Sequence, residues 1–204
     1  MRRWQGSSDT PLTRLGRQQA LAVADRLLGL DVEFCGPWAS DLDRAASTAS
    51  AISSVIGLGP TIVDPALREA AAGEWEGLTP EQIEARYPGW LAADRRPVTF
   101  EPLAQVVGRA IASLRAIAAS VHPTDAIPLV VTHSGVIRSV IRHLGGSDSR
   151  IPNLGGVWLT IDHKDSTTER LTDLLGAGGI AVGDLYNPGG IVVSGIDIPG
   201  EDPR

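Results

Sequence analysis

Three residues able to handle a phosphate ester lie at predicted strand ends, helix starts or loops. Arg44 falls in the first turn of a predicted helix, Glu69 in a loop, and His133 directly after a buried apolar run. An arginine binds phosphate in bidentate fashion, and a carboxyl group transfers protons. An imidazole can hydrogen-bond to the phosphate oxygens or attack phosphorus as a nucleophile. Taken singly, such residues are more often a solvated arginine, a surface carboxylate and a hydrogen-bonded structural histidine.

The stretch from Pro128 to Leu144 gives the clearest local prediction. Residues 129–132 form a short apolar, β-branched run that is typical of a buried strand, and apolar residues then recur at helical spacing. Ligands of open α/β sheets bind at the carboxyl ends of strands, where a following helix presents unpaired N–H groups and a partial positive charge. Because His133 occupies this junction, the sequence predicts an anionic ligand beside it.

Hydrophobic periodicity and capping signals predict the elements that would position these residues. Helices are expected over residues 13–28, 40–56, 79–87, 102–120 and 136–144. Strands are expected over residues 31–35, 61–63, 129–132, 157–162 and 191–193. Thr79, Pro80 and Gln82 have the pattern of a capping box. Strands alternating with helices predict an α/β architecture with a mostly parallel sheet.

The composition limits the function classes. The chain has 204 residues, a formal net charge of -6 and one cysteine, so we expect one domain, no disulfide and no general nucleic-acid surface. No run approaches the ~18 apolar residues of a membrane span, and no signal-peptide core follows Met1. The expected protein is soluble and cytoplasmic, without a membrane partner, and no pattern specifies an oligomeric state.

Four segments resemble motifs of the histidine phosphatase superfamily, also called phosphoglycerate-mutase-like. WQGSSDTPLTRLGRQQA resembles the part of the family that follows its first catalytic motif, and SDLDRAASTA resembles Ser-x-Leu-x-Arg-Ala-x-x-Thr-Ala. LREAAAGEWEGLT resembles Leu-x-Glu followed by Gly-x-Trp-Glu-Gly, and VTHSGVIR resembles the Ser-His-Gly motif. The resemblance runs from residue 4 to about residue 160, with the motifs in the family's order and spacing.

The resemblance implies a three-layer α/β/α fold and phosphoryl transfer through a phosphohistidine on a small phosphorylated metabolite, with no metal ion or cofactor. It makes Arg44 the phosphate-gripping arginine, Glu69 the acid/base and His133 the second histidine at the phosphate. These roles suit phosphoryl transfer, in which positioning and charge stabilisation dominate. Hydrolysis is expected rather than mutase activity, because the 64 positions between Glu69 and His133 leave no room for a mutase insertion.

Further site residues follow from the same resemblance. Gly135 would let backbone approach the phosphate, and Ser134, where the family often has glycine, would touch the phosphate or point away. The remaining substrate-binding residues match a loop near the entrance and are Gln5, Gly6 and Ser8. Two other matching residues are Trp75, expected mainly to pack, and Glu101, for which no role is evident.

The family's nucleophile lies in an Arg-His-Gly motif at the end of its first strand, and the 204 residues contain no such motif. Arg142 and His143 mimic it only superficially, because Leu144 stands where glycine belongs. Two interpretations follow. The preferred one is that Met1 is an internal start and that roughly 15 to 20 residues precede it. The other is a truncated, catalytically inactive remnant that binds phosphate or a partner.

Two expectations concern the whole chain. Without the family's first strand, neighbouring strands would keep unpaired edges and an apolar gap would separate the helix layers, which predicts poor solubility. Residues 176–204 are rich in Gly and Pro and are expected to form a tail of the single domain. A serine hydrolase is disfavoured, because Thr132 and Val136 occupy the glycine positions of a nucleophile elbow around Ser134.

Overall fold

A computed structural model describes residues 3–30, 32–121, 126–146, 151, 153–161, 169–172 and 190–195. Within these residues one sheet runs in the order β2-β1-β3-β6-β4-β5. Its strands are β1 (Phe34–Ala39), β2 (Ile62–Val63), β3 (Ile127–Thr132), β4 (Gly155–Ile161), β5 (Glu169–Thr172) and β6 (Gly190–Gly195). Strands β2, β1, β3 and β6 pair in parallel, and β4 pairs antiparallel with both β6 and β5. The predicted mostly parallel sheet is confirmed.

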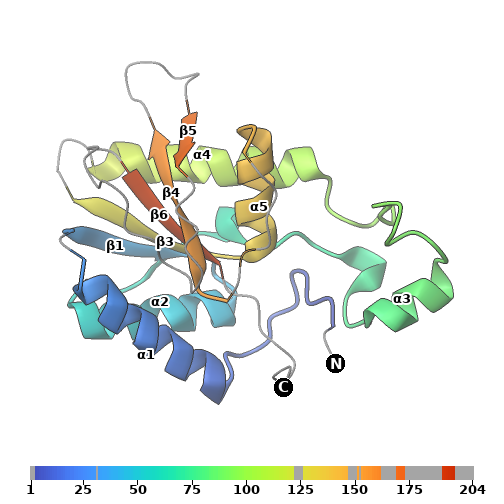
Figure 1. The fold of residues 1–204 in the computed structure, drawn as a ribbon, viewed down its shortest axis with the longest axis horizontal. Helices are drawn as coiled ribbons and strands as arrows, with labels where there is room; N and C mark the ends of the chain where they lie inside the picture. The colour runs from blue at the N-terminus through green and yellow to red at the C-terminus, as the bar shows by residue number, and fades with distance from the viewer. Residues whose placement is uncertain are drawn as a thin grey trace.

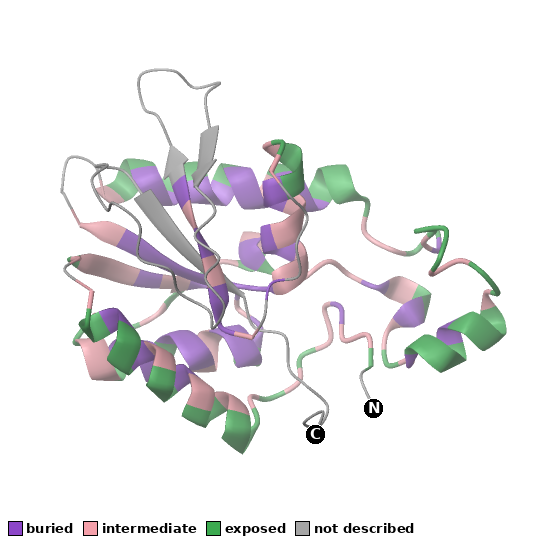
Figure 2. Cartoon of the chain, viewed as in Figure 1, coloured by how far each residue is buried: buried purple, intermediate pink, exposed green. Residues whose placement is uncertain are grey.

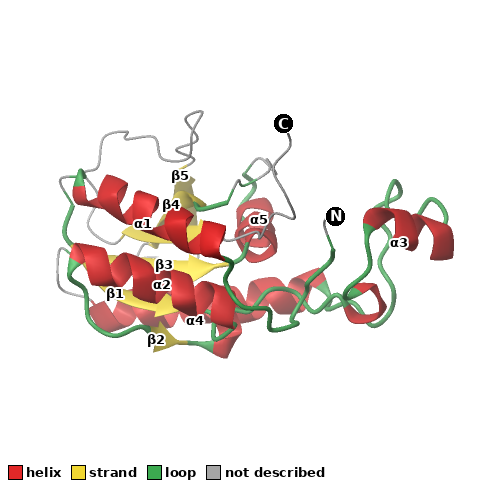
Figure 3. Ribbon diagram, turned by 90° about the horizontal axis from the view of Figure 1, so that it is seen from below, coloured by secondary structure: helices red, strands yellow, loops and turns green. Residues whose placement is uncertain are grey.

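Helices cover both faces of the sheet and give the three-layer α/β/α arrangement implied by the resemblance. Helices α1 (Arg14–Leu28) and α2 (Asp43–Ile56) lie on one face, and α4 (Leu103–Val121) and α5 (Ser134–His143) lie on the other (Figures 1 and 3). The short helix α3 (Pro80–Arg86) projects to one side of this body. Buried residues line the inner faces of the helices (Figure 2), as amphipathic helices require.

Strand β1 departs most from its expected position. It begins at Phe34 and continues to Ala39, past Gly36 and Pro37, whereas the prediction ended it at Cys35. The pairing with β3 shifts register between Cys35 and Trp38. Such a bulge accommodates a proline, which has no N–H to donate to the ladder. The Gly-Pro pair therefore marks an irregularity inside the strand rather than its end.

Helices α1 and α2 differ in how they are packed and capped. The buried face of α1 comprises Ala20, Ala24 and Leu27, whereas Leu21 and Leu28 are exposed. Alanines at the contact let α1 and α2 approach closely. The N-cap of α2 is Leu42 rather than a polar residue, because Asp9 from another segment accepts the N–H of Asp43 at 2.7 Å.

In the described sheet the edge strands are β2 and β5. Strand β6 lies between β3 and β4 and pairs with both, so these two strands have no open edge toward one another; the expected poor solubility stays a prediction. Strand β6 also lies inside the segment expected to be a tail. Residues 176–189 and 196–204 of that segment lie outside the described residues.

The capping box predicted at Thr79 is confirmed. The Thr79 hydroxyl accepts the N–H of Gln82, and the Gln82 side chain accepts the N–H of Thr79. Around α3 an aromatic cluster forms, in which the guanidinium of Arg96 lies over three rings, those of Trp4, Trp75 and Phe100. The buried Trp75 is thus a packing residue, as expected.

Helix α4 is long and apolar enough to cross a membrane by length and composition alone. In the structure its apolar side packs in the core: Val106, Ala110, Leu114 and Ile117 are all buried. Such a helix is typical of the interior of an α/β domain. The helix also carries Arg109, whose side chain reaches the backbone of Glu69.

Candidate functional site

His133 lies at the carboxyl end of β3, where the chain turns into α5. The extended backbone of His133 makes it the N-cap of that helix, although its side chain caps nothing. The side chain is fully buried, and neither ring nitrogen hydrogen-bonds to another described residue. Buried polar atoms normally have partners, so this imidazole is placed to receive one.

The carboxylate of Glu69 lies at the N-terminus of α5. It binds there to Gly135, which is two residues after His133. Its Oε2 accepts the N–H of Gly135 at 3.1 Å, and its Oε1 accepts the N–H of Ala70 at 2.8 Å. A Cβ at position 135 would lie 2.9 Å from the Glu69 carboxyl carbon. Gly135 therefore allows a close approach, but to the catalytic candidate Glu69.

Arg44 is almost completely buried, with 1% of its surface exposed, in the first turn of α2. Its guanidinium donates to the carbonyls of Ser8 at 2.8 Å and Gly6 at 2.9 Å. The carbonyl groups compensate part of the positive charge at this helix N-terminus. The structure thus brings Arg44 together with the entrance loop predicted from the sequence.

The entrance loop is fastened from its other side by Glu76. Glu76 Oε1 accepts the N–H and the hydroxyl of Ser7, both at 3.0 Å. The hydroxyl of Ser8 donates to the carbonyl of Gln5. Gly6 is buried and has a positive φ of 53°, and a Cβ there would collide with Glu76. These contacts give Gly6 and Ser8 a structural role in holding the loop against Arg44.

The electrostatic environment keeps His133 neutral. Burial, followed by the positive charges of Arg44 and Arg109, holds the pKa of His133 well below its usual value. A neutral imidazole can donate one hydrogen bond to an oxygen and accept another. An arriving phosphate dianion would oppose both causes of the shift, since it neutralises the arginine field and stabilises a protonated ring.

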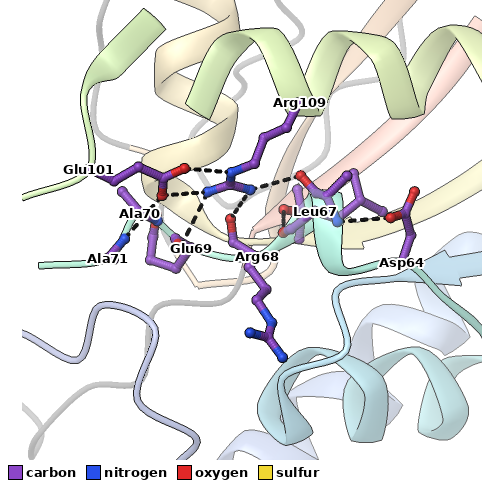
Figure 4. A network of polar contacts seen from close by, with 10 residues as sticks. Asp64, Leu67, Arg68, Glu69, Ala70, Ala71, Glu101 and Arg109 are labelled. Carbon is purple, nitrogen blue, oxygen red and sulfur yellow. Dashed lines mark hydrogen bonds and ion pairs between the residues drawn. The ribbon is translucent and has the colours of Figure 1, made fainter. Parts of the chain in front are cut away.

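Arg109 and Glu76 were not singled out from the sequence, and Glu101 had no assigned role. The residue missed with most consequence is Arg109 of α4, which forms an ion pair with Glu101 and contacts the carbonyl of Glu69 (Figure 4). Its spacing of eight residues from Glu101 gives no helical contact signal, because Glu101 precedes the helix. Arg68 points away from this group and pairs with Asp41 at 2.6 Å.

The remaining candidates lie where expected or are uninformative. Ser134 is half-buried at the first position of α5. His143 is exposed near the end of α5, so its superficial likeness to a nucleophile has no structural support. His122 and His163 lie outside the described residues. Among the described side chains, no cluster of His, Cys, Asp and Glu has the arrangement of a metal site.

Several known proteins are similar to this chain in sequence. The profile of the histidine phosphatase superfamily (branch 1) matches residues 1–173. The chain is 31% identical over 175 residues to a probable phosphoglycerate mutase of Erwinia tasmaniensis, and the match covers 81% of this chain and 79% of that protein. It is 43% identical over 100 residues to the glucosyl-3-phosphoglycerate phosphatase of Mycobacterium tuberculosis, covering 49% of this chain. That match spans only 44% of the phosphatase.

Solved structures extend the likeness over most of the fold. A mycobacterial glucosyl-3-phosphoglycerate phosphatase in complex with inorganic phosphate superimposes with a TM-score of 0.71 at 30% identity. The superposition covers 83% of this chain and 89% of that one. From the match over residues 1–173 and this shared fold, the chain belongs to the histidine phosphatase superfamily.

Proposed function

We propose that the protein is a phosphomonoester hydrolase that acts on a small phosphorylated metabolite through a phosphohistidine intermediate. The observation that carries the proposal is the buried His133, whose ring nitrogens hydrogen-bond to no described residue and whose pKa is lowered by burial and by the charge of Arg44. It lies two residues before Gly135, whose N–H donates to Glu69. An imidazole and a guanidinium that follow the carboxyl ends of β3 and β1, together with a carboxyl group at Gly135, supply donors for phosphate oxygens and one proton-transfer group. The relatives named as phosphatases support the same reaction class.

The proposed roles divide the reaction into two displacements. In the first, a nucleophilic imidazole forms an N–P bond, the ester P–O bond breaks, and Glu69 gives its proton to the leaving oxygen. In the second, water attacks phosphorus, the N–P bond breaks, and Glu69 takes the proton from water. Arg44 and His133 hold the phosphoryl oxygens throughout, and the donor set requires no metal ion or cofactor.

The remaining substrate-binding roles are part of the same proposal. Ser134 and Gly135 would contribute to phosphate binding, and the loop with Gln5, Gly6 and Ser8 would lie near the entrance of the site. The proposal assigns no nucleophile among the 204 residues, because they contain no Arg-His-Gly motif. The choice of substrates to test rests on the names of the relatives, so glucosyl-3-phosphoglycerate and 3-phosphoglycerate are the first compounds to assay.

The decisive experiment compares the 204-residue chain with a product extended through the in-frame codons upstream of Met1. We expect the extended product to hydrolyse p-nitrophenyl phosphate in the presence of EDTA, and His133→Asn to lower kcat by about 100-fold, as loss of an oxyanion-type donor does. Undiminished hydrolysis by His133→Asn, or a stop codon directly upstream, contradicts the proposal. Release of inorganic phosphate without 2-phosphoglycerate from 3-phosphoglycerate separates hydrolysis from mutase activity.

A second candidate function is favoured by one specific observation, the lack of an Arg-His-Gly motif in the 204 residues. In this alternative the chain is a non-catalytic phosphate-binding or interaction protein built on the same fold. Calorimetric titration of the 204-residue chain with inorganic phosphate tests it. Binding that is lost in His133→Asn, together with no hydrolysis by any product of the gene, supports the alternative over the enzyme.

The setting of the activity completes the proposal. We propose a cytoplasmic protein of one domain, with residues 176–204 as its C-terminal segment, whose partner is a small phosphorylated substrate and neither nucleic acid nor membrane. The net charge of -6 supports this, because it repels polyanions in general while Arg44 attracts a single phosphate locally.

A further inference from the structure

The guanidinium of Arg109 uses all of its hydrogen-bonding capacity within the protein. Nε and Nη2 donate to the two carboxylate oxygens of Glu101 at 2.8 and 2.9 Å. Nη1 donates to the carbonyls of Ala66 and Arg68 at 2.7 and 2.6 Å, and Nη2 also reaches the carbonyl of Glu69 at 3.4 Å (Figure 4). A guanidinium has five N–H donors. Because five acceptors engage its N–H groups, Arg109 fastens the loop of residues 66–71 to α4 and is not available as a direct phosphate ligand.

Glu101 fastens the same loop on the far side of Glu69. Its Oε2 accepts the N–H of Ala71 at 3.2 Å, and its own N–H donates to the carbonyl of Ala71 at 2.9 Å. The hydroxyl of Thr132 donates to the carbonyl of Leu67 at 2.6 Å. The backbone is therefore held on both sides of Glu69. The Glu69 side chain therefore has little conformational freedom, because its backbone is fixed and its carboxylate is bound to the N–H of Gly135.

The ion pair with Arg109 favours the ionised form of Glu101. Burial raises the pKa of Glu101, but hydrogen bonds from Arg109 and Ala71 outweigh it, so the pKa of Glu101 lies below its usual value. Both side chains are about four-fifths buried, at 18% and 22% exposure. A bidentate pair in such surroundings fixes geometry as well as charge.

We propose that Arg109 and Glu101 are a positioning pair that holds Glu69 at the acid/base position of the reaction. The inference rests on the proposed function for the role of Glu69. The clamp itself, by which we mean the hydrogen bonds of Arg109 and Glu101 to the backbone of residues 66–71, is a property of the folded chain. Arg109→Gln removes the bidentate pair, and Arg109→Lys keeps the charge while losing the planar fork. Neither variant removes a group that touches the substrate.

The first test needs no catalytic activity. Hydrogen exchange of the Ala70 and Ala71 amides is measured in the 204-residue chain for wild type, Arg109→Gln, Glu101→Gln and Arg115→Gln. Arg115 is an exposed arginine of the same helix and serves as the matched control. We expect exchange at least about tenfold faster in the Arg109 and Glu101 variants, with Arg115→Gln unchanged. Wild-type exchange rates in Arg109→Gln overturn the clamp.

The second test uses the extended, active product. Arg109→Gln is expected to lower kcat by about 100-fold, the cost of a misplacement of about 1 Å, with KM changed less than about threefold and Arg109→Lys intermediate. In a Glu69→Gln background, Arg109→Gln should lower kcat no further, because only displacement of Glu69 is at stake. Additive losses overturn the positioning role. If Glu69→Gln itself keeps full activity, the proposed function fails, whereas the exchange experiment still decides the clamp.

Discussion

At the scale of single residues, Gly135 shows how one missing Cβ places a catalytic candidate. Gly135→Ala should be favourable in the helix by about 1 kcal/mol from propensity alone, but its Cβ would collide with the Glu69 carboxylate. We expect the variant to expel Glu69 and to lower kcat of the extended product by about 100-fold. Gly108→Ala is the matched control, since Gly108 lies in α4 and a Cβ added there would meet nothing within 4 Å.

The two glycine variants separate the effect of helix propensity from the effect of the contact with Glu69. Gly108→Ala should raise the melting temperature and leave kcat unchanged, because it gains only helix propensity. A Gly135→Ala variant that behaves in the same way, more stable and fully active, would show that the close contact with Glu69 has no role in the reaction.

His133 makes a second prediction at this scale, for stability against pH. Its folded pKa is depressed by burial and by Arg44 and Arg109, so below about pH 6.5 the unfolded chain binds a proton that the folded chain refuses. The unfolding free energy should therefore fall as pH drops from about 6.5, by up to about 1.4 kcal/mol per pH unit. Urea titrations of wild type and His133→Asn at pH 5.5, 6.5 and 7.5 measure it.

The variant lacks the titrating ring, so its stability should vary much less over this range. Carboxylates with depressed pKa values, those of Asp41 and Glu101, lose their stabilising charge only at lower pH, near and below the usual range of a carboxyl group. Equal pH dependence in wild type and His133→Asn between pH 5.5 and 7.5 would mean that His133 is not buried in its neutral form.

At the scale of elements, strand β6 completes the sheet between β3 and β4. Deleting residues 190–204 should leave unpaired N–H and C=O groups on both neighbours, one of which leads directly into His133. We expect a lower melting temperature and concentration-dependent aggregation, measured by light scattering during a thermal ramp. Deleting only residues 196–204 keeps β6 and is the control, and similar aggregation of both truncated chains would contradict the role of β6.

Most elements could be predicted from sequence because their signals are local. The capping box at Thr79, the strand before His133 and the periodic helix over residues 103–121 depend on neighbours along the chain. Strand β1 was misplaced because its continuation past Gly36 and Pro37 depends on a bulge against β3. Strand β5 was missed, since its four residues pair only with β4 and carry no alternation long enough to detect.

The candidate site divides in the same way. Arg44, Glu69 and His133 were found because their motifs are contiguous in sequence. The residues that hold them, Arg109 and Glu76, contact segments 40 or more positions away. Hydrophobic periodicity along the sequence does not predict contacts over such distances. Their roles follow only from three-dimensional hydrogen bonds to backbone groups, which any polar side chain could in principle make.

At the scale of the whole molecule, residues 4–8 join the sheet body to the aromatic cluster around α3. Arg44 of α2 holds the carbonyls of Gly6 and Ser8 from one side. From the other side, Trp4 exchanges backbone hydrogen bonds with Leu78 and Gly77 at 2.9 and 2.7 Å, and Glu76 accepts from Ser7. Arg44 and the loop thus depend on one another, so changes in the aromatic cluster should reach the proposed phosphate site.

Glu76→Ala tests this connection. Glu76 accepts hydrogen bonds from Ser7 and, at 3.3 Å, from the N–H of Ala72; bonds to a charged group are worth about 1.5–3 kcal/mol each. We expect Glu76→Ala to speed amide exchange of Ser7 and Ser8 and to weaken phosphate binding by about tenfold, because Arg44 loses its fixed carbonyl partners. Glu74→Ala changes an exposed neighbour whose side chain bonds to Tyr87, and it should leave phosphate affinity unchanged. Faster exchange at Ser8 with unaltered phosphate affinity would mean that Arg44 keeps its position without the loop, and that the aromatic cluster and the phosphate site are independent parts.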